Sequence, residues 1–178
     1  MKVLVIACSL DPNSRSAVLC ASAAESLAQR GAKVEVLDLR EIPLPMCDGA
    51  EAYGDDALPG LVRSIAEADA VLLGVPIYNY DVNAAAKNLI ELTGRAAWTN
   101  QTVGFLCAAG GRGSYMSAMP LANSLMLDFR SVIVPRFVYA TGDDFEGDQI
   151  QPGIAERIGL LADETLRLAG VMKPTQPA

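Results

Sequence analysis

The 178-residue chain contains no histidine. This absence removes the commonest general base, so it excludes a Ser-His-Asp or Cys-His catalytic arrangement. A zinc site would have to be built from the four cysteines alone, which lie far apart with no Cys-x-x-Cys spacing. We therefore expect no metal site, and we interpret Cys8, Cys20, Cys47 and Cys107 as reduced, mostly buried thiols.

Long apolar runs and clusters of basic residues are also missing. No stretch reaches the roughly 18 apolar residues that cross a bilayer, and the first apolar run is too short for a signal peptide. The net charge is −7 and the basic residues are scattered, which argues against nucleic acid or an anionic membrane as a partner. We expect a cytoplasmic protein that binds neither.

The length and the 51% hydrophobic content fit a single domain. We assign residues 1–172 to that domain and residues 173–178 to a C-terminal tail. Short apolar runs that predict strands cover residues 2–8, 33–39, 70–75, 102–108 and 131–139. Segments of helical composition lie between and after them, at residues 15–30, 58–68, 83–98, 115–129 and 152–169.

Strict alternation of strands and helices predicts an α/β fold with a parallel sheet covered by helices on both faces. For five strands the order 2-1-3-4-5 is common, and ligands then bind at the carboxyl ends of the first and third strands. Three loops rich in Gly, Ser, Asn and Tyr converge at this edge, namely residues 9–16, 76–83 and 109–115.

The first loop places hydroxyls and one cation where a strand meets a helix. The N–H groups at a helix N-terminus are unpaired and carry partial positive charge, so they favour an anion. Ser9, Ser14 and Ser16 add hydroxyl donors. Arg15 places a cation at the positive end of the helix dipole, and a bound dianion would offset this unfavourable interaction. The alternative is that Asn13 or Ser14 merely caps the helix and Arg15 lies in solvent.

The second loop brings two tyrosines and two amides to the end of the third strand. Tyr78 and Tyr80 offer stacking surface, and Asn79 can reach the polar edge of a heterocycle. The loop could equally be a turn in which the tyrosines cover a helix end and Asn83 caps the next helix.

The third loop, residues 109–115, is rich in glycine. Gly110, Gly111 and Gly113 let the backbone approach a ligand and supply accessible N–H donors. The loop fits neither the Walker pattern nor Gly-x-Gly-x-x-Gly, because Met116 occupies the last place. It could also be a flexible turn.

Together these loops resemble the flavodoxin-like NAD(P)H-dependent FMN reductase family, over residues 2 to about 170. The first loop is similar to FMN reductases that serve alkanesulfonate monooxygenases. Pro76-x-Tyr78-Asn79 is shared with azo, quinone and chromate reductases. The resemblance implies a flavodoxin-like three-layer α/β sandwich, with a five-stranded parallel sheet of order 2-1-3-4-5 and FMN as cofactor.

The resemblance also implies the site residues. The cofactor-binding residues are Ser9, Asn13, Ser14, Arg15 and Ser16 in the phosphate loop, Pro76, Ile77, Tyr78 and Asn79 at the ring, and Gly110, Gly111, Arg112 and Gly113 on the pyrimidine side. Many members have Arg where Asp11 stands, Glu where Ile77 stands, and Pro-Gly where Asn83-Ala84 stand. Asp11 would repel a phosphate unless its carboxylate faces solvent.

The implied function is hydride transfer from NADPH or NADH to FMN, and then to free flavin, a quinone or another small acceptor. The flavin carries the chemistry, so we expect no catalytic side chain. The resemblance also implies a homodimer or homotetramer. The alternative is a flavodoxin-type electron carrier that docks to redox partners, although such carriers usually lack an arginine like Arg15 in the phosphate loop. A receiver domain is a poor match, because Pro76 stands where it needs an Asp.

Overall fold

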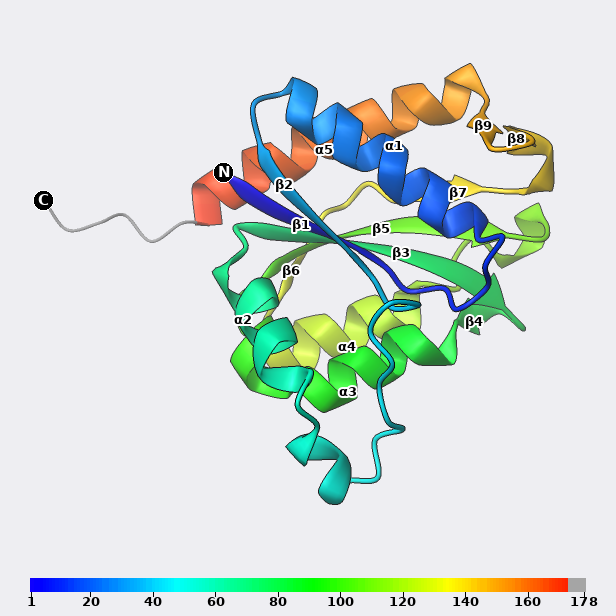
Figure 1. Ribbon diagram of the computed structural model, residues 1–178. Coiled ribbons are helices and arrows are strands. Elements are labelled where there is room, and N and C mark those ends of the chain that lie inside the picture. Colours follow the sequence, from blue (N-terminus) through cyan, green and yellow to red (C-terminus); the bar gives the residue numbers. More distant parts are fainter. Residues whose placement is uncertain (173–178) are drawn as a thin grey trace, which may run out of the picture.

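The computed structural model describes residues 1–172, and the C-terminal tail expected at residues 173–178 lies outside the described residues. A twisted, mainly parallel sheet lies between two layers of helices (Figure 1). Its strands are β1 (Lys2–Ala7), β2 (Lys33–Asp38), β3 (Ala70–Tyr78), β4 (Asp81–Val82), β5 (Thr102–Ala109), β6 (Val132–Ile133) and β7 (Val138–Ala140). The helices are α1 (Arg15–Gln29), α2 (Leu58–Glu67), α3 (Ala84–Trp98), α4 (Met119–Phe129) and α5 (Pro152–Met172).

The order of the sheet is β2-β1-β3-β5-β6, with β4 paired to β3 and β7 paired to β5. The predicted order 2-1-3-4-5 is therefore confirmed. Helices α1 and α5 cover one face, and α2, α3 and α4 cover the other (Figure 1). The central strands β3 and β5 are almost entirely buried, since helices cover both of their faces.

The strand count differs from the five that we predicted. The run at residues 131–139 is interrupted, and β6 and β7 each pair separately with β5. Pro135 lies between them and has no N–H for the ladder. The third strand continues past Val75 to Tyr78 and turns back as β4 in an antiparallel hairpin.

Two further differences concern the loops after the sheet strands. The helix expected from residue 115 begins only at Met119, because residues Arg112–Ser114 form a short 3-10 helix, η2. The long connection before α5 contains a second 3-10 helix, η3 (Gly142–Asp144), and a small hairpin of β8 (Phe145–Glu146) and β9 (Gln149–Ile150). A further 3-10 helix, η1 (Glu51–Gly54), precedes α2.

Helix α1 packs unusually close to the middle of β3. A Cβ atom added at Gly74 would lie 2.1 Å from Cys20 Sγ and 3.1 Å from the carbonyl oxygen of Ser16. Only glycine fits there, so this contact fixes the N-terminus of α1 over the ends of β1 and β3.

The four cysteines are free, and Cys8, Cys20 and Cys107 are buried, which confirms that most of the thiols lie inside. Within residues 1–172, none of the helices has the length and apolar character needed to cross a bilayer.

Candidate functional site

An open cavity of about 760 Å³ lies at the carboxyl ends of β1, β3 and β5. Of the predicted site residues, all but three line this cavity: Gly111, Arg112 and Gly113 do not. The lining residues are Ser9, Asp11, Asn13, Ser14, Arg15, Ser16, Pro76, Ile77, Tyr78, Asn79, Ala108, Ala109 and Gly110. The cavity thus combines the first two loops with the end of β5.

The first loop ends in a capped helix. Ser14 is the N-cap of α1: its Oγ accepts a hydrogen bond from the N–H of Ala17 at 3.1 Å and shares a second with Ser16 Oγ at 3.0 Å. Ser9 Oγ accepts a hydrogen bond from the N–H of Asp11 at 3.2 Å. Ser14 therefore is a cap, as the alternative interpretation predicts. Among residues 1–172, the first two helical N–H groups, those of Arg15 and Ser16, have no hydrogen-bond partner that would compete with an anion.

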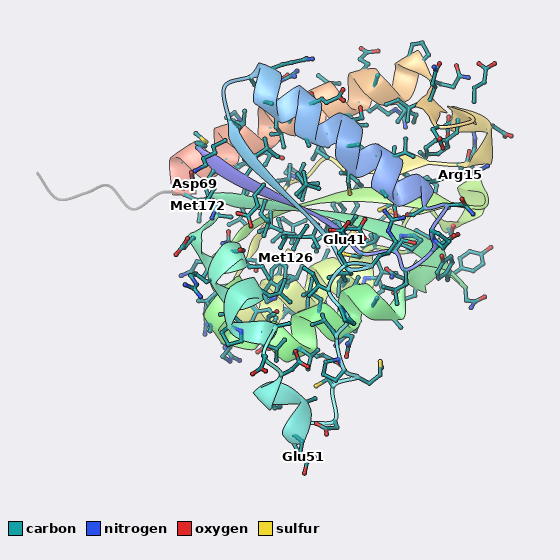
Figure 2. The ribbon with its side chains drawn as sticks, in the orientation of Figure 1. Arg15, Glu41, Glu51, Asp69, Met126 and Met172 are labelled. Atoms are coloured by element: carbon teal, nitrogen blue, oxygen red, sulfur yellow. The ribbon has the colours of Figure 1, made fainter. Side chains whose placement is uncertain are left out.

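Arg15 is exposed but does not extend freely into solvent. Its guanidinium lies over the ring of Phe145 in β8, with 5.4 Å between Cζ and the ring centroid. A Cβ at Gly142 would lie 3.1 Å from Arg15 Nη1. Figure 2 shows Arg15 at the start of α1, beside the segment that carries β8 and β9. The loop after β7 therefore holds this cation at the edge of the cavity.

A pair of residues at the end of β2 stabilises the tip of the first loop. Arg40 Nε donates to both carboxylate oxygens of Asp38, at 2.9 and 3.0 Å, and Arg40 Nη1 donates to the carbonyl of Pro12 at 3.0 Å. These hydrogen bonds from Arg40 hold the pKa of Asp38 below its ordinary value. Asp11 is exposed, and its carboxylate accepts the N–H of Asn13 at 2.8 Å.

The second loop is a tight hairpin turn. Asn79 and Tyr80 have φ angles of 52° and 64°, both in the left-handed region, as a two-residue type I′ turn requires. Left-handed backbone is unusual for a tyrosine. Tyr78 lines the cavity and is 53% exposed, so its ring is available to a ligand there, whereas Tyr80 is 72% exposed and is not among the lining residues. The Tyr80 hydroxyl lies 3.4 Å from where a Cβ of Gly113 would be, which places the second and third loops in contact.

Asn83 links the first strand to the second loop. Asn83 is the N-cap residue of α3, as the alternative interpretation expects, but within residues 1–172 its side chain makes no capping hydrogen bond. Its Nδ2 instead donates to the carbonyl of Cys8 at 2.7 Å, and its buried Oδ1 has no hydrogen-bond partner in the described part of the chain. The hydrogen bond from Nδ2 to the end of β1 fixes the amide in an orientation in which Oδ1 accepts no helical N–H.

The third loop is fixed by Tyr139 and opens onto a different cavity. Tyr139 Oη donates to the carbonyl of Gly111 at 2.7 Å and hydrogen-bonds Ser114 Oγ at 2.5 Å. Arg112 lines a second cavity of about 290 Å³, together with Tyr115, Tyr139, Thr141, Asp144, Gln151, Gly153, Ile154 and Arg157. The sequence did not reveal this second cavity, because its walls join the third loop to residues 139–157, which lie more than twenty residues further along the chain.

The thiols near the site are not ionised near neutral pH. Burial raises the pKa of Cys20 and of Cys107 to about 12, and burial also raises the pKa of Cys8 well above its ordinary value. With no histidine in the chain, the cavity offers anion-binding groups, aromatic surface and backbone donors. This arrangement suits the binding of a cofactor that carries its own chemistry.

Comparisons with known proteins agree with this interpretation. A family model described as NADPH-dependent FMN reductase matches residues 1–146. An NAD(P)H-dependent FAD/FMN reductase of Geobacillus thermodenitrificans is 26% identical over 144 residues, covering 79% of this chain and 77% of the relative. An NADPH:quinone oxidoreductase of Arabidopsis thaliana is 28% identical over 154 residues, covering 79% and 78%. The fold is shared with an oxidoreductase from Corynebacterium diphtheriae, with a TM-score of 0.75, 20% identity and coverage of 96% and 97%.

Proposed function

The chain belongs to the NADPH-dependent FMN reductase family, and we propose that it binds FMN in the cavity of about 760 Å³ at the carboxyl edge of the sheet. It takes hydride from NADPH or NADH and passes electrons to a small acceptor such as free flavin or a quinone. Family membership favours this enzyme over a flavodoxin-type electron carrier.

The observation that carries the proposal is the polarity of the cavity. The lining combines the buried Ser9, Ser14 and Ser16 and the cation of Arg15, from the first loop, with the exposed ring of Tyr78 from the second loop. FMN needs both kinds of contact, with a phosphate at one end and a flat ring at the other. The volume falls within the roughly 300–1,000 Å³ typical of small-molecule sites.

In this proposal, the residues of the chain bind and orient FMN. Ser9, Ser14 and Ser16 donate hydrogen bonds to the phosphate together with the first N–H groups of α1, and Arg15 adds a charge-assisted contact. Pro76, Ile77, Tyr78, Asn79 and Gly110 flank the ring. FMN, when bound, supplies the hydride-accepting chemistry. No side-chain acid or base is required.

We further propose that the protein is a homodimer or homotetramer. Apolar side chains lie exposed on α4 and just before it, where Met116, Met126 and Leu127 are 61%, 39% and 75% exposed. Clusters of exposed apolar surface often mark protein interfaces. Light scattering coupled to size exclusion at micromolar concentration measures the oligomeric state directly, and a monomer with flavin bound overturns the proposed oligomer.

We also propose that the protein is cytoplasmic, because its free thiols stay reduced there. Cell fractionation tests this location.

The central experiment is a flavin titration followed by turnover. Purified protein should quench FMN fluorescence on binding, and the complex should bleach when mixed anaerobically with NADPH or NADH. With excess free flavin, the protein alone should oxidise the nicotinamide over many turnovers. FMN binding without such turnover would instead indicate an electron carrier.

A further inference from the structure

The second cavity, of about 290 Å³, lies between the third loop and the start of α5. We propose that it binds the 2′-phosphate of NADPH through Arg112 and Arg157, and so makes the enzyme prefer NADPH to NADH. This inference rests on the proposed function, because it assigns the donor of that same reaction.

The charges of the cavity favour an anion. Arg112 and Arg157 both line it, and within residues 1–172 neither guanidinium forms an ion pair or a hydrogen bond. Asp144 is the only carboxylate among the lining residues. Its Oδ2 already accepts hydrogen bonds from the N–H and the hydroxyl of Thr141, at 2.7 and 2.9 Å. The cavity is lined by two cations and by one carboxylate that already accepts hydrogen bonds, so its local charge is positive although the net charge of the chain is −7.

The two arginines are close enough to act together. The pKa of Asp144 is lowered, first by the hydrogen bonds from Thr141 and then by the charges of Arg112 and Arg157. Arg112, Arg157 and Asp144 also line the same cavity, which places both guanidiniums around one carboxylate. Arginine presents a planar fork of N–H donors that matches phosphate oxygens, and a phosphate monoester carries a charge near −2. A terminal phosphate suits this pair of donors.

The remaining walls suit the nucleoside that carries such a phosphate. Tyr115 is 52% exposed and packs edge-on against Tyr139, with 5.4 Å between ring centroids. Its exposed ring offers a stacking surface for adenine. The cavity is smaller than those that enclose a whole drug-sized ligand. It therefore fits one end of a dinucleotide whose other end lies elsewhere.

The flavin cavity is within reach of that other end. Gly110 lines the flavin cavity and Arg112 lines the second one, and two residues of chain span at most about 7 Å. The segment after β7 also borders both cavities, since Gly142 lies beside the Arg15 guanidinium and Thr141 lines the second cavity. A donor can thus place its nicotinamide at the flavin and its phosphate between the arginines.

Binding of donor fragments tests the proposal without turnover. Calorimetry on the FMN-loaded protein should show adenosine 2′,5′-bisphosphate binding more tightly than adenosine 5′-monophosphate. R112A and R157A should each weaken the bisphosphate by about 10- to 150-fold and leave the monophosphate nearly unchanged. R63A, which removes an exposed arginine on α2, is the matched control and should change neither.

Steady-state kinetics supply the second readout. R112A and R157A should raise KM for NADPH and leave KM for NADH and the affinity for FMN unchanged. An equal rise in KM for NADPH and NADH would indicate that the arginines bind the pyrophosphate, which both donors carry, and would overturn the 2′-phosphate assignment. Loss of FMN affinity in R112A would make Arg112 a flavin contact and overturn it too, as would unchanged constants in both variants. A wild type that binds no FMN, or reduces it with neither donor, refutes the proposed function instead.

Discussion

The guanidinium of Arg15 lies over the ring of Phe145, with 5.4 Å between Cζ and the ring centroid. Arg15 is the first residue of α1, where the helix dipole disfavours a cation. The face of an aromatic ring attracts a cation, so Phe145 offsets part of this cost and holds the side chain at the rim of the flavin cavity. A phosphate in the cavity would offset the rest.

Replacing Arg15 with alanine should weaken FMN selectively. The lost contact is a charge-assisted hydrogen bond of roughly 1.5–3 kcal/mol, so the dissociation constant of FMN should rise by about 10- to 150-fold. Riboflavin has no phosphate and should bind the wild type and Arg15→Ala almost equally. Fluorescence titration with both flavins measures this. Equal weakening of the two flavins would show that Arg15 supports the fold rather than the phosphate.

Phe145 should act on FMN only through Arg15. Phe145→Leu keeps an apolar side chain in the hairpin but removes the ring face, and an exposed cation–π contact is worth about 0.5–1 kcal/mol. We expect FMN affinity to fall about 2- to 5-fold. In an Arg15→Ala background the same change should have no further effect, as a double-mutant cycle would show. An identical loss in both backgrounds contradicts the coupling.

Gly74→Ala should destabilise the protein through its contact with α1. The new Cβ would lie 2.1 Å from Cys20 Sγ, and overpacking of this kind costs about 1–3 kcal/mol. Urea unfolding should show the loss, and adding Cys20→Ala should recover part of it. Gly54→Ala is the control, since a Cβ there meets no atom within 4 Å. Full stability of Gly74→Ala would mean that α1 shifts freely on the sheet.

The buried thiols predict how stability depends on pH. Burial raises the folded-state pKa of Cys20 and Cys107 to about 12, above their ordinary value of 9.0. A group with a raised folded pKa contributes full stability below its unfolded pKa and loses it as pH rises further. The free energy of unfolding should therefore be insensitive to these thiols between pH 6 and about 8, and should fall from about pH 9 upward. Urea unfolding across this range checks the trend, and a Cys20→Ala variant should lose less stability above pH 9 than the wild type.

Local sequence patterns predicted most of the fold. The apolar runs that begin at Lys2, Lys33, Ala70 and Thr102 each form a strand starting at the predicted residue. Burial on both faces explains the simple apolar pattern of β1, β3 and β5, whereas β2 is a partly exposed edge strand. The β3–β4 hairpin was missed because its left-handed turn residues, Asn79 and Tyr80, include no glycine. The break between β6 and β7 has a local cause in the sequence, because Pro135 has no N–H for the ladder.

The candidate site was predictable where it is local and not where it depends on tertiary contacts. The capped helix start at Ser14 follows from adjacent residues. The hydrogen bonds from Arg40 to the first loop and the stacking of Arg15 on Phe145 join distant segments. No spacing in the sequence indicates them. Arg112 shows the same limit, because a pattern placed it in the third loop but could not tell which cavity its side chain lines.

Hydride transfer in this enzyme should depend little on pH between about 6 and 8. The chain has no histidine, and burial keeps Cys8, Cys20 and Cys107 protonated in that range. Stopped-flow mixing with a donor deuterated at nicotinamide C4 should show a primary isotope effect on flavin bleaching at every pH in this range. Tyr78→Ala should slow the step by disturbing ring alignment, where small misplacements cost on the order of a hundredfold. A steep pH dependence near neutrality that disappears on replacing one cysteine would instead indicate thiol redox chemistry, and it would remove the role assigned to the flavin cavity.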